Sequence, residues 1–387
     1  MRVLLLSPLE GRDPLSGDTS YTRSLLDAPP PGVLYTDYVT ALDDGTLRLR
    51  GRRPRHGDGQ PGDGLLLVVR LLESLLRRCG LMFREPTWFA EVDPAAFDVV
   101  HLHLFALRQS GTQVPVMSSA GYPLTELYRF REGWRRGRLR LAERLERTWA
   151  TRLGVHIPWL HQVTPSIMST YSQASADHLV SNGCDPEDVR RIGTGLPDLG
   201  LPPRRPRRDG EGVRLLFVGR DFDRKGGTAA VEAFRELRRR GVEASLTVVT
   251  EERAVPKALL GDDVTWSFGL RREQVLSHVL PGCDLLLAPT TSDCGVPYAL
   301  LEAMQAGLAI VVCPLPWLDD RLGPPSVTRV NHDSRAIADA VQGLLAGQEL
   351  PQAQRRAASL YEAEYTMTAL GEQLRSAYLD AVARRQA

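Results

Sequence analysis

Short apolar runs alternate with amphipathic, helix-like segments along most of the 387-residue chain. This alternation is typical of βαβ units and parallel sheets. Residues 45–63 interrupt it, because they are rich in glycine, arginine, proline and aspartate and predict a loop. For the first half of the chain the pattern predicts strands at 3–7, 33–36, 98–103, 114–118 and 162–165, and helices at 20–26, 65–78, 126–152 and 171–182.

A second series of such units follows a break in the pattern. Residues 197–212 read PDLGLPPRRPRRDGEG and predict a linker, because proline, glycine and charge occur there without periodicity. We therefore predict an N-terminal domain over 1–196, the linker over 197–212, a second domain over 213–366 and a C-terminal helix over 367–387. The second series predicts strands at 213–218, 244–249, 285–288 and 309–312, and helices at 228–240, 272–279, 297–306, 335–345 and 367–384.

Two doubly wound α/β domains imply where a ligand binds. In such folds ligands lie beyond the carboxyl ends of the parallel strands. We therefore expect two Rossmann-like domains that face a central cleft, and we expect the functional site in that cleft.

Composition excludes several classes of protein. The formal net charge is only +1, which argues against a dedicated nucleic-acid binder. The five cysteines lack CxxC spacing, so we expect a reducing, cytoplasmic setting. The N-terminal apolar run is too short for a signal peptide, and no apolar stretch approaches the roughly 18 residues of a membrane span. Lysine is rare, since only Lys225 and Lys257 occur among 48 basic side chains.

The strongest chemical signal opens the second domain. Residues 215–227 read LLFVGRDFDRKGG, so an apolar strand ends at Gly219 and is followed by Arg220 and then Lys225. Glycine lets a ligand approach the backbone closely. Two cations beyond a strand end predict a diphosphate site, where each charge-assisted hydrogen bond contributes about 1.5–3 kcal/mol. The alternative is a charged surface turn.

The second signal is a strand, a small polar loop and a helix over residues 288–307. The helix is predicted to begin near Pro297, and amide groups at a helix start bind anions. Glu302 lies further along this helix among apolar residues, and a buried carboxylate needs a partner. A sugar diol would be one such partner, and a structural role is the alternative.

These two stretches resemble glycosyltransferase family 4, the retaining enzymes of the GT-B fold. The resemblance covers most of the chain and is most specific between 213 and 320. It implies that Arg220 and Lys225 hold the diphosphate of a nucleotide-sugar donor and that Glu302 binds the ribose hydroxyls. Phe268, Gly269 and Leu270 would form the nucleobase loop, in which a backbone group meets the edge of the base, and the last helix would cross back onto the first domain.

The first domain carries weaker matches to the same family. Gly17 is retained in the loop after the first strand, where the family has a pair of glycines, and this loop would lie near the donor phosphate or the acceptor. The strand over 98–103 ends in His101 and His103, which matches the family's His-x-His. For each histidine a hydrogen-bonded structural role is an equal alternative.

Two positions depart from the family pattern, and both concern the sugar end of the donor. Cys294 stands where the family has its first glutamate, and the adjacent Asp293 is a candidate to supply that carboxylate. Gly121 stands where many members have a histidine close to the transferred sugar. Backbone amides are a further candidate for contacts to the sugar, namely those of Cys294, Gly295 and Val296.

The predicted reaction is transfer of a sugar from a nucleoside-diphosphate sugar to an acceptor hydroxyl with retention of anomeric configuration. Arg220, Lys225, His103 and Asp293 are the candidate catalytic residues. No cofactor and no metal are expected, because cations meet the diphosphate charge and the DFD sequence at 221–223 predicts a solvated turn. The alternatives are a sugar-nucleotide epimerase and a non-catalytic partner subunit of the same fold.

A basic stretch extends from Arg129 to Arg152 and includes two tryptophans. It predicts a solvated helix face, contact with an anionic membrane surface or contact with an acidic acceptor. Peripheral contact with the inner membrane face therefore stays an alternative to a freely diffusing cytoplasmic protein.

Overall fold

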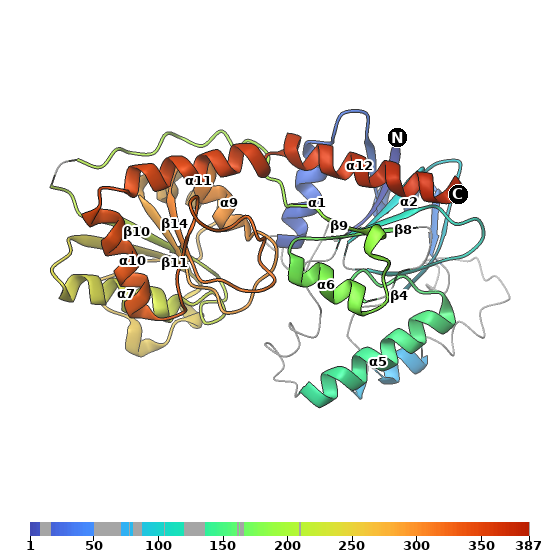
Figure 1. Cartoon of the computed structure of the whole chain (residues 1–387), viewed down its shortest axis with the longest axis horizontal. Helices are drawn as coiled ribbons and strands as arrows, with labels where there is room; N and C mark the ends of the chain where they lie inside the picture. The colour runs from blue at the N-terminus through green and yellow to red at the C-terminus, as the bar shows by residue number, and fades with distance from the viewer. Residues whose placement is uncertain are drawn as a thin grey trace. The chain divides into compact units, whose positions relative to one another are not determined.

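The chain folds into two compact units. Unit 1 comprises Met1–Ile192 and Gly371–Ala387, and unit 2 comprises Gly193–Leu370. Figure 1 labels the main helices and strands of the two units. The computed structural model describes residues 1–7, 17–49, 71–76, 78–79, 87–103, 105–119, 136–160, 162, 166–208 and 210–386.

Unit 1 contains a parallel sheet of six strands in the order β2-β1-β5-β7-β8-β9. Its central strands are buried at nearly every position, as expected for parallel strands covered on both faces. The order reverses between β1 and β5, which makes that position the topological switch point of the sheet. The strands are β1 (Arg2–Leu6), β2 (Leu34–Asp37), β5 (Val99–His103), β7 (Val116–Ser119), β8 (Ser166–Thr170) and β9 (Val189–Arg191).

A second, three-stranded sheet in unit 1 was missed by the sequence analysis. It has the order β3-β4-β6, in which β3 pairs antiparallel and β6 pairs parallel with β4. Charged residues interrupt these short strands, so they lack the continuous apolar run of a central strand. The strands are β3 (Leu47–Leu49), β4 (Thr87–Val92) and β6 (Ala106–Gln109), and the helices of unit 1 include α1 (Gly17–Asp27), α2 (Tyr38–Asp43), α5 (Arg136–Leu153) and α6 (Gln173–Ser181).

Of the strand predicted at 162–165, only Gln162 lies within the described residues. The strand β8, which pairs with β7 and β9, begins at Ser166.

Unit 2 contains a second parallel sheet of six strands, in the order β12-β11-β10-β13-β14-β15. This is the order of a doubly wound Rossmann sheet, and the switch point lies between β10 and β13. The strands are β10 (Val213–Val218), β11 (Ala244–Thr250), β12 (Thr265–Phe268), β13 (Leu285–Ala288), β14 (Ala309–Val312) and β15 (Thr328–Arg329).

Helices cover both faces of the unit 2 sheet (Figure 1). Alternate residues of β10 point to opposite faces, so Leu215 and Phe217 pack with α7 and α10, whereas Leu216 packs with α9 and α11. The helix predicted at 272–279 is present but changes type, because α8 passes into a π-helical turn at Val275–Val279. The helices are α7 (Gly227–Arg239), α8 (Arg272–Gln274), α9 (Tyr298–Gln305), α10 (Ser334–Ala346) and α11 (Leu350–Glu364).

The last helix, α12 (Met367–Gln386), belongs to unit 1 from Gly371 onward. Within unit 1 its Tyr378 hydroxyl lies 2.6 Å from Nδ1 of His101 and 2.9 Å from the hydroxyl of Tyr35. The second nitrogen of His101 lies 2.9 Å from the Ser119 hydroxyl. Buried polar groups are stable only when they are hydrogen-bonded, so this network holds α12 against β5 and β2.

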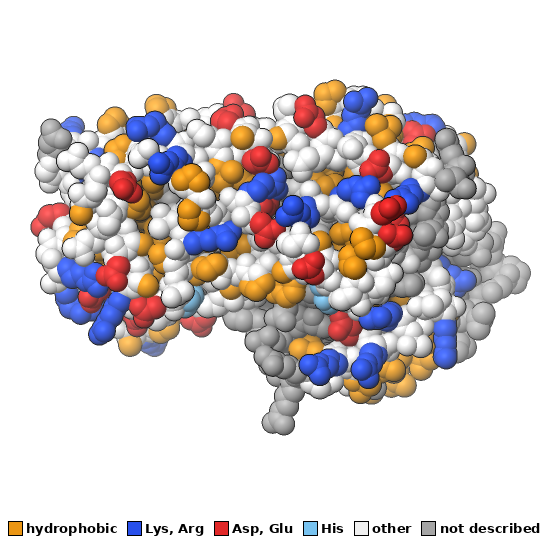
Figure 2. All heavy atoms as spheres, in the orientation of Figure 1, with side chains coloured by type: hydrophobic (Ala, Val, Ile, Leu, Met, Phe, Trp, Pro, Cys, Tyr) orange, Lys and Arg blue, Asp and Glu red, His pale blue; other side chains and the backbone are white. Residues whose placement is uncertain are grey.

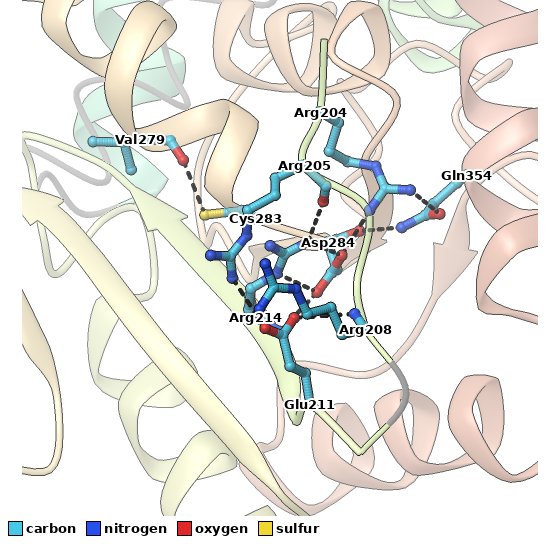
Figure 3. Close-up of polar contacts among 9 residues, drawn as sticks. All are labelled: Arg204, Arg205, Arg208, Glu211, Arg214, Val279, Cys283, Asp284 and Gln354. Carbon is cyan, nitrogen blue, oxygen red and sulfur yellow. Dashed lines mark hydrogen bonds and ion pairs between the residues drawn. The ribbon is translucent and has the colours of Figure 1, made fainter.

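The segment expected as a linker is anchored to unit 2 by a buried carboxylate (Figure 3). The side chain of Asp284, at the start of β13, is 1% exposed. Arg214 donates to both of its oxygens, at 2.9 and 2.7 Å, and Arg204 from the segment donates at 2.7 Å. Gln354 of α11 accepts from Arg204 and donates to the Asp284 backbone carbonyl. Three parts of unit 2 are therefore joined through one side chain.

Candidate functional site

A pocket lies at the switch point of unit 2. Its floor is formed by the carboxyl ends of β10 and β13 and by the start of α9, and it contains two charged side chains, Lys225 and Asp293. This is the position at which open α/β sheets bind ligands. The residues that line it are Phe217, Val218, Lys225, Leu286, Leu287, Ala288, Thr290, Asp293, Pro297, Ala299 and Leu300.

Glycines shape the turn that carries Lys225. Gly226 has φ +79°, and a side-chain carbon there would lie 1.8 Å from the Pro289 carbonyl oxygen. At Gly219 such a carbon would lie 2.7 Å from Cβ of Lys225. Glycine at 226 therefore lets the turn pack against the loop after β13, and glycine at 219 leaves room for the Lys225 side chain beside the end of β10.

The cations of this turn each face a carboxylate. Lys225 Nζ donates to Asp293 across the pocket. Arg224 donates to Asp221 at 2.8 Å and lies 3.8 Å from Asp293. Arg220 lies on the β11 side, with its Nε 3.6 Å from Glu251. The structure thus brings Lys225 and Asp293 together, while Arg220 points to a different carboxylate.

The DFD sequence of this turn does not form part of an acidic cluster. Asp221 pairs with Arg224 and its side chain is 48% exposed. Within the described ranges of the chain, no three His, Cys, Asp or Glu side chains gather in a way that could hold a metal ion.

Glu302 is held by a cation that the sequence analysis did not single out. Arg272 Nε donates to Glu302 Oε1 at 2.6 Å, and the Glu302 side chain is 9% exposed. Burial raises the pKa of the Glu302 carboxyl above its usual range, and the Arg272 guanidinium opposes that shift. The signal available in the sequence was a basic residue two positions after Leu270. The Arg272–Glu302 pair joins the start of α8 to α9.

Phe268 and Leu270 flank a tight bend at Gly269, which has φ +64° and donates to the Thr250 carbonyl at 3.2 Å. Phe268 ends β12 and stacks on Trp266, with ring centroids 5.9 Å apart. Leu270 packs on the face of the sheet that carries α9. The bend thus lies at the same strand-end edge as Lys225.

The backbone amides of Gly295 and Cys294, before α9, are hydrogen-bonded within the protein. Gly295 donates its N–H to the Trp317 carbonyl at 2.9 Å, and Cys294 donates to the Asp293 carboxylate at 3.2 Å. Val296 is buried in the core against α9. The Gly295 and Cys294 amides are therefore engaged within the protein, because the loop after β14 pairs with this segment at Leu318.

The candidate residues of unit 1 lie at the switch point of its own sheet. His103 ends β5, is 4% exposed and packs on the Tyr21 ring at 4.8 Å. His101, in the hydrogen-bonded network with Tyr378, has its pKa lowered to about 3 by burial and by the neighbouring His103. Gly17 opens α1. Gly121 lies outside the described residues.

Comparison with known proteins shows that unit 2 is similar to glycosyltransferases. Residues 212–347 match the family model for group 1 glycosyl transferases. WcaL of Salmonella typhimurium, whose name assigns it to colanic acid biosynthesis as a glycosyltransferase, is 26% identical over 156 residues, or 38% of either chain. AmsK of Erwinia amylovora, named an amylovoran biosynthesis glycosyltransferase, is 28% identical over 146 residues, 34% of this chain and 35% of its own. The alignments thus span under two fifths of these relatives.

Solved structures extend the likeness to the whole chain. HepE of Anabaena, solved in complex with UDP and glucose, superimposes with a TM-score of 0.57 at 14% identity and covers 97% of this chain and 98% of its own. Sucrose-phosphate synthase of Thermosynechococcus elongatus superimposes with a TM-score of 0.63 at 16% identity, covering 99% of each chain. The fold is GT-B. The expected pair of Rossmann-like domains is confirmed, and the pocket with Lys225 lies at the switch point of the second GT-B domain.

Proposed function

We propose that this GT-B protein is a glycosyltransferase of family 4, which transfers a sugar from a nucleoside-diphosphate sugar to an acceptor hydroxyl with retention. The observation that carries the proposal is the pocket of unit 2, which sets a lysine at the switch point of a Rossmann sheet. The match of residues 212–347 to group 1 glycosyl transferases supports it.

The pocket suggests a role for each candidate residue of unit 2. Lys225 and Arg220 would bind the donor diphosphate, with Gly219 allowing the phosphates to approach the backbone. Glu302, held by Arg272 at 2.6 Å, would accept hydrogen bonds from the ribose hydroxyls. Phe268 and Leu270 would flank the base. Since the HepE structure contains UDP, a uracil nucleotide is the first donor to test.

The proposed chemistry depends on charge that develops as the sugar leaves. Departure of the nucleotide places negative charge on the β-phosphate, and preorganised cations such as Lys225 and Arg220 stabilise that charge most in a desolvated site. The leaving phosphate would take the acceptor proton, so no protein nucleophile is required. Because side-chain cations meet the charge, we propose a metal-independent reaction. His103 would lie on the sugar and acceptor side.

Nucleotide-sugar binding is the direct test of this function. We expect UDP-glucose, or the GDP- or ADP-linked equivalent, to raise the melting temperature of the full chain, since a ligand present at 100 times its Kd stabilises the folded state by about 2.7 kcal/mol. Proton NMR of the product would then show the retained anomeric configuration. Release of an isomeric sugar nucleotide without acceptor would instead indicate an epimerase. If the protein neither bound a nucleotide sugar nor turned one over, it would be a non-catalytic subunit.

We further propose that α5 contacts an anionic membrane surface. Its outward face carries Leu141, 49% exposed, and Leu145, 37% exposed. Arg140 and Arg144 are exposed beside them. Figure 2 shows basic and hydrophobic side chains intermingled over α5. Exposed leucines flanked by arginines suit an interface in which apolar groups enter and cations meet lipid phosphates. None of the helices in the described part of the chain could span a membrane.

Sedimentation with liposomes tests the membrane contact. The full chain should bind vesicles containing phosphatidylglycerol and not neutral phosphatidylcholine vesicles. Reversing Arg140 and Arg144 to glutamate should weaken binding at least about tenfold, because each basic residue near an anionic surface contributes about 1 kcal/mol. Arg355→Glu, exposed on α11, is the matched control and should change binding little. Equal vesicle binding by the unmodified chain, the Arg140 and Arg144 variant and the Arg355 variant would exclude the membrane contact.

A further inference from the structure

The carboxylate of Asp293 occupies the position where an anion would meet Lys225. Lys225 Nζ donates to its Oδ2, Arg224 lies 3.8 Å from the same oxygen, and the Cys294 amide donates to Oδ1 at 3.2 Å. The Asp293 side chain is 16% exposed and that of Lys225 is 23% exposed. An ammonium, a guanidinium and a backbone N–H are also the groups that typically bind a phosphate oxygen.

A donor diphosphate would compete with this carboxylate for Lys225. Two negative groups at one ammonium repel each other, and in a half-buried pocket water screens them weakly. We therefore expect Asp293 to move away from Lys225 when a phosphate binds. In the protein without nucleotide the carboxylate neutralises the positive charge of Lys225 and so competes with the donor diphosphate.

The backbone around Asp293 is fixed, so the exchange requires only a side-chain movement. The Thr291 amide donates to the Arg224 carbonyl at 2.9 Å, and Arg224 donates back to the Ser292 carbonyl at 2.7 Å. These bonds tie the loop after β13 to the turn that carries Lys225. A change of side-chain rotamer at Asp293 would release Lys225 without moving the loop.

We propose that Asp293 is an exchange carboxylate. It neutralises Lys225 in the nucleotide-free protein, it is displaced by the β-phosphate of the donor, and it then accepts hydrogen bonds from hydroxyls of the transferred sugar. The sugar is bonded to that same phosphate, so the displaced carboxylate lies beside it. This role rests on the proposed function. It makes Asp293 a specificity-determining residue for a donor sugar with free hydroxyls.

Asp293→Asn separates the two parts of this role. Removing the competing charge should tighten the binding of inorganic pyrophosphate and of UDP about tenfold, measured by isothermal titration calorimetry on the full chain. The same variant should gain less affinity for UDP-glucose than for UDP, because the amide replaces a carboxylate that accepts sugar hydroxyls. Binding and selectivity thus change in opposite directions, which loss of folding cannot produce.

Asp221→Asn is the matched control, since it removes one negative charge from the same turn but contacts Arg224 rather than Lys225. This variant should change the affinities for pyrophosphate and for UDP less than twofold. Asp293→Ser is a second variant that removes the charge with a smaller side chain. Unchanged pyrophosphate affinity in both Asp293 variants would overturn the exchange. Tighter pyrophosphate binding without binding of any nucleotide would support the charge competition and refute the glycosyltransferase proposal instead.

Discussion

Replacing Lys225 with alanine is expected to lower the turnover of the donor sugar about 10²–10³-fold, as loss of one preorganised charge-stabilising donor does in other enzymes. The effect should fall mainly on kcat, because charge on the β-phosphate is greatest in the transition state. Steady-state release of UDP from UDP-glucose, with acceptor present, measures it. Melting temperatures of both proteins would show that the variant is folded.

The other lysine of the chain provides a matched control. Lys257 is exposed in unit 2, in a short 3₁₀ turn at Lys257–Leu259, and lies outside the lining of the pocket. Lys257→Ala removes the same charge and should leave turnover within about twofold. If the Lys225 variant turned over as fast as the Lys257 variant, Lys225 would have no role in stabilising the leaving phosphate.

Removing the Asp284 carboxylate should destabilise the protein more than any other single change discussed here. In Asp284→Ala the Arg214 guanidinium, 11% exposed, keeps its burial and loses both hydrogen bonds to the carboxylate. Breaking one partner of a buried ion pair costs about 3–5 kcal/mol. Arg204 also loses its contact with the carboxylate and keeps its bond to Gln354, so the segment before β10 is held less firmly. The free energy of unfolding in urea measures the loss.

An exposed ion pair of the same geometry shows how much of the expected loss of stability comes from burial. Arg235 donates to both oxygens of Asp263, at 2.8 and 3.0 Å, but these side chains are 32% and 44% exposed. Asp263→Ala should therefore cost no more than about 1 kcal/mol. Similar losses for the two variants would show that the Asp284 cluster contributes no more than a surface pair.

Sequence periodicity predicted the elements that hold the site. The strands expected at 213–218 and 309–312 coincide with β10 and β14, because central parallel strands are apolar on both faces and read as continuous runs. The three-stranded sheet of unit 1 could not be predicted in this way. Its strands are short and interrupted by charges such as Arg48 and Arg108, which neither a period of two nor an apolar run describes.

The partners of the charged residues depend on contacts that local sequence does not contain. Lys225 and Asp293 are 68 residues apart, and Arg214 and Asp284 are 70 apart. His101 meets Tyr378 across 277 residues. Spacing along the chain predicted that a lysine follows a strand end, but it could not show which carboxylate would face it. The same limit hid Arg272, whose importance follows only from its contact with Glu302.

The amino-acid sequence by itself determined the two series of βαβ units and the residue types at their strand ends, because periodicity and glycine placement are local properties of the chain. Only the tertiary structure decided that Asp293 sits on Lys225, that Arg272 holds Glu302, and that the Gly295 amide is already bonded to Trp317. These contacts form where strands and loops distant in sequence meet at one sheet edge, so their geometry exists only after the sheet has assembled.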